Sequence, residues 1–280
     1  MTESAPLIFG FDREPPSRLG RLSARTAAGP IERLFGLSTL QHYYASTRRA
    51  MDGGSVKRFL DIGLSELDVE LVCKHSHRER IPPEGPVVVV ANHPFGGLEG
   101  MLLAQLLLTG RDDVRVLANY MLEPIPDMRE ILILVDPWAR TGSRGRNARA
   151  LKETLRHVQG GGMVAVFPAG EVAHRSFFDG GQLRESRWRA SIGRIIQRAG
   201  APILPVYFCG ENSLAFQLAG MVHPMLRTAL LPREMLNKCG RRIEVRVGHR
   251  IDAAEVRQTD AAAFAAYLQA RTEQLKHRVG

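Results

Sequence analysis

Cysteine is scarce in this chain, and the three that occur lie far apart. Cys73, Cys209 and Cys239 form no Cys-x-x-Cys pair within the 280 residues. A disulfide framework and a cysteine-rich zinc site are therefore not expected. We expect a reducing compartment, in which the thiols act as small apolar side chains.

Long apolar runs are also missing. No run reaches the roughly eighteen apolar residues that a membrane-spanning helix needs. The N-terminal stretch contains acidic residues and prolines and has no apolar centre, unlike a secretory signal. These absences predict a cytoplasmic protein whose membrane contact is peripheral, on the inner face of the cell membrane.

Several catalytic signatures are absent as well. The chain has no Gly-x-Ser-x-Gly elbow and no phosphate-binding P-loop, which counts against a serine hydrolase and an NTPase. His75 and His77 lie two residues apart, but no third ligand follows at a recognisable spacing. A solvated turn explains them better, so no metal site is predicted.

Positive charge is what the chain has in excess. Its formal net charge is +9 and its pI is near 10. Such a surface favours nucleic acid, phosphate-bearing substrates or an anionic membrane face, although general arginine usage explains the excess equally well. No run interleaves stacking aromatics with Lys or Arg, so nucleic acid is not a predicted partner.

The apolar pattern divides the chain into two parts. Residues 1–30 have no period and predict a loose arm, and residues 31–68 have helical spacing. We expect this arm and helical segment, residues 1–68, to join an α/β domain over residues 69–280 in one folded unit. An aromatic cluster near residues 34–44 favours core packing over contact with a bilayer surface.

Strands and helices alternate from residue 69 onward. This alternation predicts a mixed, largely parallel central sheet with helices on both faces, preceded by the N-terminal helical segment. The expected strands are residues 69–73, 87–91, 114–118, 131–135, 163–167, 203–208 and 243–247. The expected helices are residues 98–108, 147–158, 187–199, 213–230 and 260–277.

The stretch 87–100 carries the strongest chemical signal. Its first five residues are β-branched or small and uncharged, which predicts a buried strand, and an apolar helix follows the loop. The loop between them contains a histidine, two glycines and a carboxylate: His93, Gly96, Gly97 and Glu99. Chemistry in open α/β sheets lies at the carboxyl ends of strands, so we expect an active site here.

These residue types suit acyl transfer. His93 can take the proton of an acceptor hydroxyl, and Glu99 can hold the imidazolium that forms. Gly96 and Gly97 lack a Cβ, so the backbone can approach the substrate or offer amide donors to an oxyanion. For an isolated histidine a structural role would be the better interpretation; the strand end, the glycines and Glu99 together favour catalysis.

Asn92-His93 followed by a carboxylate resembles the Asn-His-x-x-x-x-Asp signature of the glycerolipid acyltransferases, the lysophosphatidic acid acyltransferase superfamily. Here five residues, rather than four, separate His93 from the acid. Other segments resemble the hemolysin-like branch, which includes acyltransferases of ornithine-lipid synthesis: Ile81-Pro-Pro-Glu-Gly-Pro86, Phe167-Pro-Ala-Gly-Glu171, Pro205-Val-Tyr-Phe-Cys-Gly-Glu-Asn-Ser213 and Arg233-Glu-Met-Leu-Asn-Lys238. They occur in order and cover most of the chain.

The resemblance also implies substrate contacts. Phe167, Pro168, Gly170 and Glu171 stand where the family has a Phe-Pro-Glu-Gly-Thr block that contacts the acceptor headgroup, and Arg175 follows. In that block the acid precedes the glycine, whereas here Glu171 follows it, which suits an acceptor other than glycerol 3-phosphate. Asn92 adjoins the histidine, and Arg140 is the candidate for the arginine that the family uses for phosphate.

The implied function is transfer of a fatty acyl group from acyl carrier protein or coenzyme A to a lysolipid hydroxyl, such as that of a lysophospholipid or lyso-ornithine lipid. No cofactor beyond the acyl donor is expected. N-acylation of an amino-acid headgroup is one alternative. The other is a basic module without catalysis that binds lipid or nucleic acid.

Overall fold

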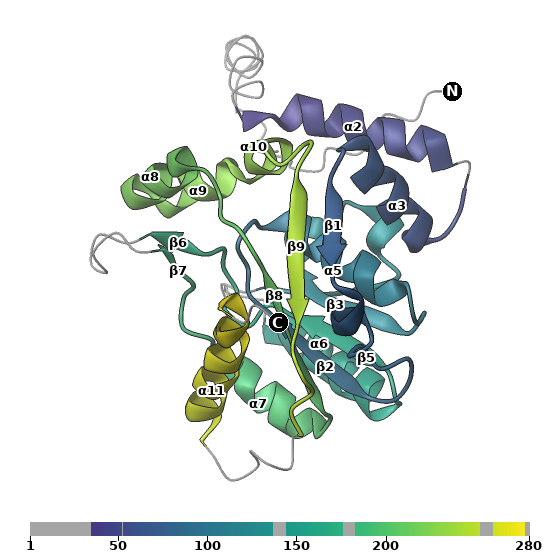
Figure 1. Ribbon diagram of the computed structural model, residues 1–280, viewed down its shortest axis with the longest axis vertical. Helices are drawn as coiled ribbons and strands as arrows, with labels where there is room; N and C mark the ends of the chain where they lie inside the picture. Colours follow the sequence, from purple (N-terminus) through teal and green to yellow (C-terminus); the bar gives the residue numbers. More distant parts are fainter. Residues whose placement is uncertain (1–34, 52, 137–143, 176–182, 253–259, 278–280) are drawn as a thin grey trace.

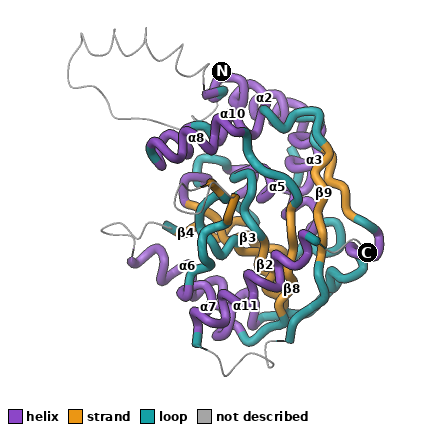
Figure 2. The backbone as a smooth tube through the Cα atoms, turned by 60° about the vertical axis from the view of Figure 1, so that its left-hand side comes forward, coloured by secondary structure: helices purple, strands orange, loops and turns teal. Residues whose placement is uncertain are grey.

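The computed structural model describes residues 35–51, 53–136, 144–175, 183–252 and 260–277. A twisted central sheet runs through the molecule, with helices packed on both of its faces (Figure 1). Figure 2 shows the strands in the interior and most helices around them. The α/β class expected from the sequence is confirmed.

Seven strands form the sheet in the order β1-β9-β8-β2-β5-β3-β4. Every neighbouring pair is parallel except β8 with β9. The strands are β1 (Glu70–Cys73), β2 (Val87–Ala91), β3 (Val114–Asn119), β4 (Leu132–Val135), β5 (Met163–Val166), β8 (Ile203–Phe208) and β9 (Arg242–Val247). These match the seven predicted strands to within one residue at each end.

Strand β2 is buried on both faces because of its alternating side chains. Val87, Val89 and Ala91 join one apolar core, and Val88 and Val90 join the other. The first core also contains residues of α2 (Leu37–Met51), α3 (Val56–Glu66) and α5 (Gly97–Leu108). The second contains residues of α6 (Arg144–Gln159), α7 (Ala190–Ala199) and α11 (Ala261–Glu273).

The N-terminal helical segment packs on the first of these cores. Tyr44 of α2 is buried, its ring lies edge-on to Phe59 of α3, and its hydroxyl donates to Asp127. Tyr43 and Tyr44 of the aromatic cluster thus pack in the core, as the sequence favoured, and residue 34 lies outside the described part. Residues 35–66 and the sheet therefore share one core.

Several parts of the secondary structure differ from the sequence prediction. The helix expected over residues 213–230 is broken into α8 (Leu214–Val222) and α9 (Pro224–Ala229), because His223 is extended and Pro224 has no N–H to continue the helix. A hairpin of β6 (His174–Arg175) and β7 (Leu183–Arg184) was not predicted. Short helices α4 (His75–Arg78) and α10 (Leu231–Leu236) were also missed as separate elements.

We predict that Gly193→Ala destabilises the packing of α7 on α11. A Cβ at Gly193 would lie 2.3 Å from the carbonyl oxygen of Ala261, so the helices must move apart. Overpacking of this kind costs about 1–3 kcal/mol. Gly145→Ala in α6 is the matched control, because a Cβ there meets no atom within 4 Å. Thermal unfolding of both variants checks this, and equal midpoints would contradict it.

Candidate active site

The histidine loop, residues 92–96, connects the carboxyl end of β2 to the start of α5. The imidazole Nδ1 of His93 lies 2.7 Å from Oε1 of Glu99, whose side chain is 0% exposed. The pair is an ion pair by distance, although the ring N–H is not aimed squarely at the oxygen. The structure therefore places the acid beside the histidine despite the longer spacing.

Glu99 also fixes the backbone of the loop. It is the third residue of α5, and its Oε1 accepts the N–H groups of Phe95 and Gly96 at 3.0 and 2.9 Å. A glutamate at this position commonly reaches back to the residue that caps the helix. The same carboxylate oxygen thus holds the helix start and faces the imidazole.

The two glycines have different surroundings. Gly96 has a φ of +108°, and a Cβ there would lie 2.8 Å from a methyl group of Leu231. Gly97 is exposed, and a Cβ there would meet nothing within 4 Å. Gly96 is therefore required by the backbone and its packing, whereas Gly97 faces open space at the start of α5.

Neighbouring strands hold the loop from both sides. The side chain of Asn92 exchanges two hydrogen bonds with the backbone of Phe208, the last residue of β8. The carbonyl of His93 accepts the N–H of Ala173, which follows β5. The amide of Asn92 is therefore engaged in joining strands, and its predicted contact with substrate stays a prediction.

The second predicted block, residues 167–171, contacts His93 through Phe167. Its ring centroid lies 4.7 Å from that of His93, with the planes tilted by 30°. The approach follows from the sheet order, because β2 and β5 are neighbours and both end at this edge. Pro168 is buried, and the φ of +71° at Gly170 turns the chain back.

Glu171 does not face His93 but pairs with α9. Its carboxylate accepts hydrogen bonds from Arg227 at 2.9 Å and from the Ser186 hydroxyl. Burial alone raises the pKa of Glu171, but the Ser186 hydrogen bond and the Arg227 charge outweigh it, so the pKa is lowered. Arg227 is itself buried. The acid of the second block thus anchors a distant helix to the site.

Two of the predicted substrate-binding side chains lie outside the part of the chain that the structure describes. Arg140 lies outside the described residues. Arg175 belongs to β6, but its side chain also lies outside what the structure describes.

Glu185 is a site residue that the sequence analysis missed. Its carboxylate accepts the backbone N–H of His93 at 2.8 Å. Burial raises the pKa of Glu185 to about 7, against smaller opposing contributions from Trp188 and His93. No motif surrounds this residue, so nothing in the local sequence pointed to it. Only the folded chain brings together two residues that are 92 positions apart.

The pKa of His93 is set by opposing effects. Burial lowers it, whereas the negative charges of Glu99 and Glu185 raise it, and the net result is a pKa above the ordinary value of 6.5. A base with a raised pKa accepts a proton more readily once it is neutral. The two carboxylates thus make the imidazole a stronger base.

A second polar cluster behind the loop joins two of the other segments noted in the sequence. The buried carboxylate of Glu234 accepts from the backbone and hydroxyl of Ser213 and from Asn237. Lys238 donates to Asn212 and lies over the ring of Phe95 at 5.2 Å. Asn212 in turn donates to the Phe95 carbonyl. This cluster supports the histidine loop from the side of α10.

Neither a thiol nor a metal ion has an evident place in this arrangement. Burial raises the pKa of all three cysteine thiols, which disfavours the thiolate. Within the described ranges, no group of three or more His, Cys, Asp and Glu side chains could hold a metal ion. What the described residues do bring together is a histidine and two carboxylates, those of Glu99 and Glu185.

We predict that Glu185→Gln flattens the dependence of stability on pH. Because the folded-state pKa of Glu185 is about 7, above its ordinary 4.5, the wild type loses stability as the pH rises through this interval. Glutamine keeps an oxygen for the His93 N–H but carries no charge. Melting temperatures between pH 4.5 and 8 check this, with Glu70→Gln on the exposed edge as control. An unchanged decline in the Glu185→Gln protein would contradict it.

Comparison with known proteins identifies relatives of this chain. A family model described as acyltransferase matches residues 59–278. Lyso-glycine lipid O-acyltransferases of Bacteroides thetaiotaomicron and Phocaeicola vulgatus are 29% and 27% identical over 156 residues. The match covers 55% of this chain and 54% and 52% of those proteins, so it spans about half of their length.

A solved structure is also similar. It is the 1-acyl-sn-glycerophosphate acyltransferase PlsC of Thermotoga maritima, with 18% identity and a TM-score of 0.49 over 86% of this chain and 97% of that one. The family model covers well over half of the chain, and the matched range includes the segments at His93 and Phe167. The protein belongs to the acyltransferase family.

Proposed function

We propose that the protein transfers a fatty acyl group from a thioester donor to the hydroxyl of a lysolipid, with His93 as the general base. The observation that carries this proposal is the position of His93 at the end of β2, 2.7 Å from the fully buried Glu99. Coenzyme A and acyl carrier protein are the candidate donors. Both are anionic and suit the net charge of +9.

The reaction needs no covalent intermediate on the enzyme. The acceptor hydroxyl attacks the thioester carbonyl while its proton passes to Nε2 of His93, since Nδ1 faces Glu99. The tetrahedral intermediate then expels the thiol, which takes the proton back from the imidazolium. The raised pKa values of the three thiols favour this direct route over an acyl-cysteine.

Each neighbour of His93 has a defined task in this scheme. The charge of Glu99 stabilises the imidazolium, as the aspartate does in a serine-protease triad. The exposed start of α5 at Gly97 offers a backbone N–H to the developing oxyanion. The amide of Gly96 cannot serve this purpose while it donates to Glu99. The ring of Phe167 packs against the imidazole of His93 and fixes its orientation.

The relatives guide the choice of acceptor. Two curated relatives are named as O-acyltransferases of a lyso-glycine lipid, which favours a hydroxyl on a lysolipid with an amino-acid headgroup over N-acylation. Glu171 supports an acceptor other than glycerol 3-phosphate, because the acid follows Gly170 rather than preceding it. We place the enzyme on the inner face of the membrane, where it would meet such a lipid. No helix in the described part of the chain is long and apolar enough to cross a bilayer.

We predict that His93→Ala lowers transfer by about 10²- to 10⁴-fold, the usual contribution of a general base. The purified enzyme is incubated with acyl-coenzyme A or acyl carrier protein and with lyso-glycine lipid, lyso-ornithine lipid or lysophosphatidic acid. Mass spectrometry then identifies the acylated product. His75→Ala, at the exposed start of α4, is the control.

Folding of the His93→Ala protein is verified by its circular dichroism and melting temperature. Turnover within tenfold of the wild type in a folded protein would refute the role of His93. No transfer to any of the three acceptors by the wild type would refute the proposed function.

A further inference from the structure

Helices α8 and α9 form an apolar hairpin, residues 214–229, at one end of the molecule. In Figure 1 they lie side by side above β6 and β7, away from the central sheet. Five large apolar side chains are exposed there: Leu214 by 66%, Leu218 by 51%, Val222 by 77%, Met225 by 57% and Leu226 by 42%. Among the described residues only one other large apolar side chain is comparably exposed, Tyr267 on α11.

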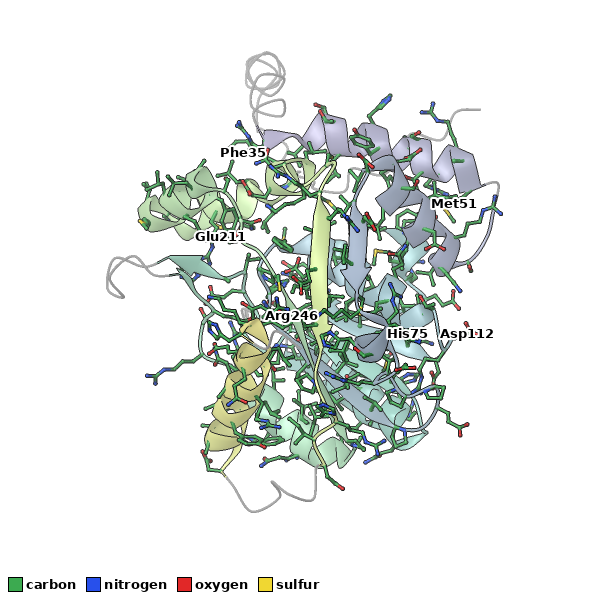
Figure 3. The ribbon with its side chains drawn as sticks, in the orientation of Figure 1. Phe35, Met51, His75, Asp112, Glu211 and Arg246 are labelled. Atoms are coloured by element: carbon green, nitrogen blue, oxygen red, sulfur yellow. The ribbon has the colours of Figure 1, made fainter. Side chains whose placement is uncertain are left out.

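The exposed side chains follow the geometry of a helix face. Leu214, Leu218 and Val222 are four residues apart, so they form one stripe along α8. The opposite side of α8 buries Phe216 and Gln217. Figure 3 shows side chains of this region projecting outward from the molecule. A contiguous apolar stripe of this kind marks an interaction surface.

The apolar hairpin exposes almost no charge. Within residues 214–229 the only formally charged side chain is Arg227, and it is buried and paired with Glu171. His223 is the only other ionisable side chain, and its Nδ1 accepts the N–H of Met225. An acidic or basic protein partner would therefore find nothing complementary on this stripe.

Basic residues lie beside the hairpin instead. Helix α8 packs against β6. The described residues 183–189, at and after β7, contain three arginines against one acid. Arg187 in this segment is exposed. An apolar stripe next to a basic segment is the combination that suits an anionic bilayer, whose headgroups attract the cations while its acyl region accepts the apolar side chains.

The hairpin is physically joined to the active site. Arg227 of α9 pairs with Glu171, five residues after the end of β5. Leu231, at the start of α10, packs against Gly96 of the histidine loop. A surface that contacts the hairpin is therefore held close to His93.

We propose that the apolar hairpin docks the protein on an anionic lipid bilayer, with the side chains of Leu214, Leu218, Val222, Met225 and Leu226 entering the interfacial region. The occupant follows from the basic neighbours and from the proposed function, on which this inference rests. A lysolipid acceptor resides in a bilayer, and Arg227 ties the hairpin to the segment after β5, which hydrogen-bonds the histidine loop. Docking at this place brings the acceptor to His93 without a spanning helix.

The test compares Val222→Gln/Met225→Gln with the wild type and with Tyr267→Gln. Tyr267 is also an exposed apolar side chain, 39% exposed, but lies on α11. Full-length proteins are sedimented with vesicles of phosphatidylethanolamine containing a minority of phosphatidylglycerol. Turnover is measured with a long-chain lysolipid in these vesicles and with a water-soluble short-chain lysolipid. Light scattering gives the oligomeric state.

We expect the double variant to bind vesicles at least about tenfold more weakly than the wild type, because it lacks two of the apolar side chains that enter the bilayer. It should lose turnover of the vesicle-borne acceptor to the same extent and keep that of the short-chain one. Tyr267→Gln should behave as the wild type in every assay.

Vesicle binding by the double variant equal to that of the wild type would overturn the proposal. The proposal would also be overturned if the wild type did not bind vesicles but formed a dimer that the double variant does not form. A second copy of the chain would then cover the hairpin. Failure of the proposed function gives a different result: the wild type then acylates neither the vesicle-borne nor the short-chain acceptor. In that case the vesicle-binding measurement alone tests the docking proposal.

Discussion

The buried carboxylate of Glu99 is the interaction on which the site depends. A charged group without exposure is costly unless partners compensate it. Here one oxygen receives two backbone N–H groups and faces the imidazole of His93. The other oxygen has no hydrogen-bond partner among the described residues. Most of the cost of burying the Glu99 carboxylate is therefore offset by groups of the histidine loop. The conformation of this loop and the charge of His93 are linked as a result.

The sheet supplies the rigidity that this pair needs. Strands β8, β2 and β5 are adjacent and parallel, so the loops that follow them meet at one edge. Asn92 ties the histidine loop to the end of β8, and Ala173 ties it to the segment after β5. Glu185 adds a third hold on the backbone of His93. Three attachments thus preorganise the imidazole that we propose as the base, and efficient proton transfer requires such positioning.

Most of the fold could be predicted because the apolar pattern is strong. The β-branched run Val87–Ala91 predicted a buried strand, and the positions of the other strands followed from similar runs. The break at Pro224 was missed because the apolar period continues across it, although a proline inside a helical pattern is itself a signal that the helix ends. The β6 and β7 hairpin was missed because each strand has two residues, too few for a period.

The site was predictable only where its residues are close in sequence. His93 and Glu99 share one loop and helix start, so local reasoning could pair them. The predicted contact of Glu171 with substrate stays a prediction, and the sequence did not predict that its carboxylate pairs with Arg227, 56 residues away. Glu185 has no local signature, because its effect on the loop arises from long-range folding. Lys238 belongs to a segment that the sequence singled out, but that segment did not predict its position over the ring of Phe95. The local sequence pattern does not show which distant segments come into contact in the folded protein.

The central claim is that the charge of Glu99 makes His93 a stronger base, and titration of the His93 ring by NMR tests it most directly. The account predicts that the pKa of His93 lies above 6.5 in the wild type and falls in Glu99→Gln, which keeps an oxygen for the Phe95 and Gly96 amides but removes the charge. Equal pKa values in the two proteins, or a wild-type value below 6.5, would contradict it.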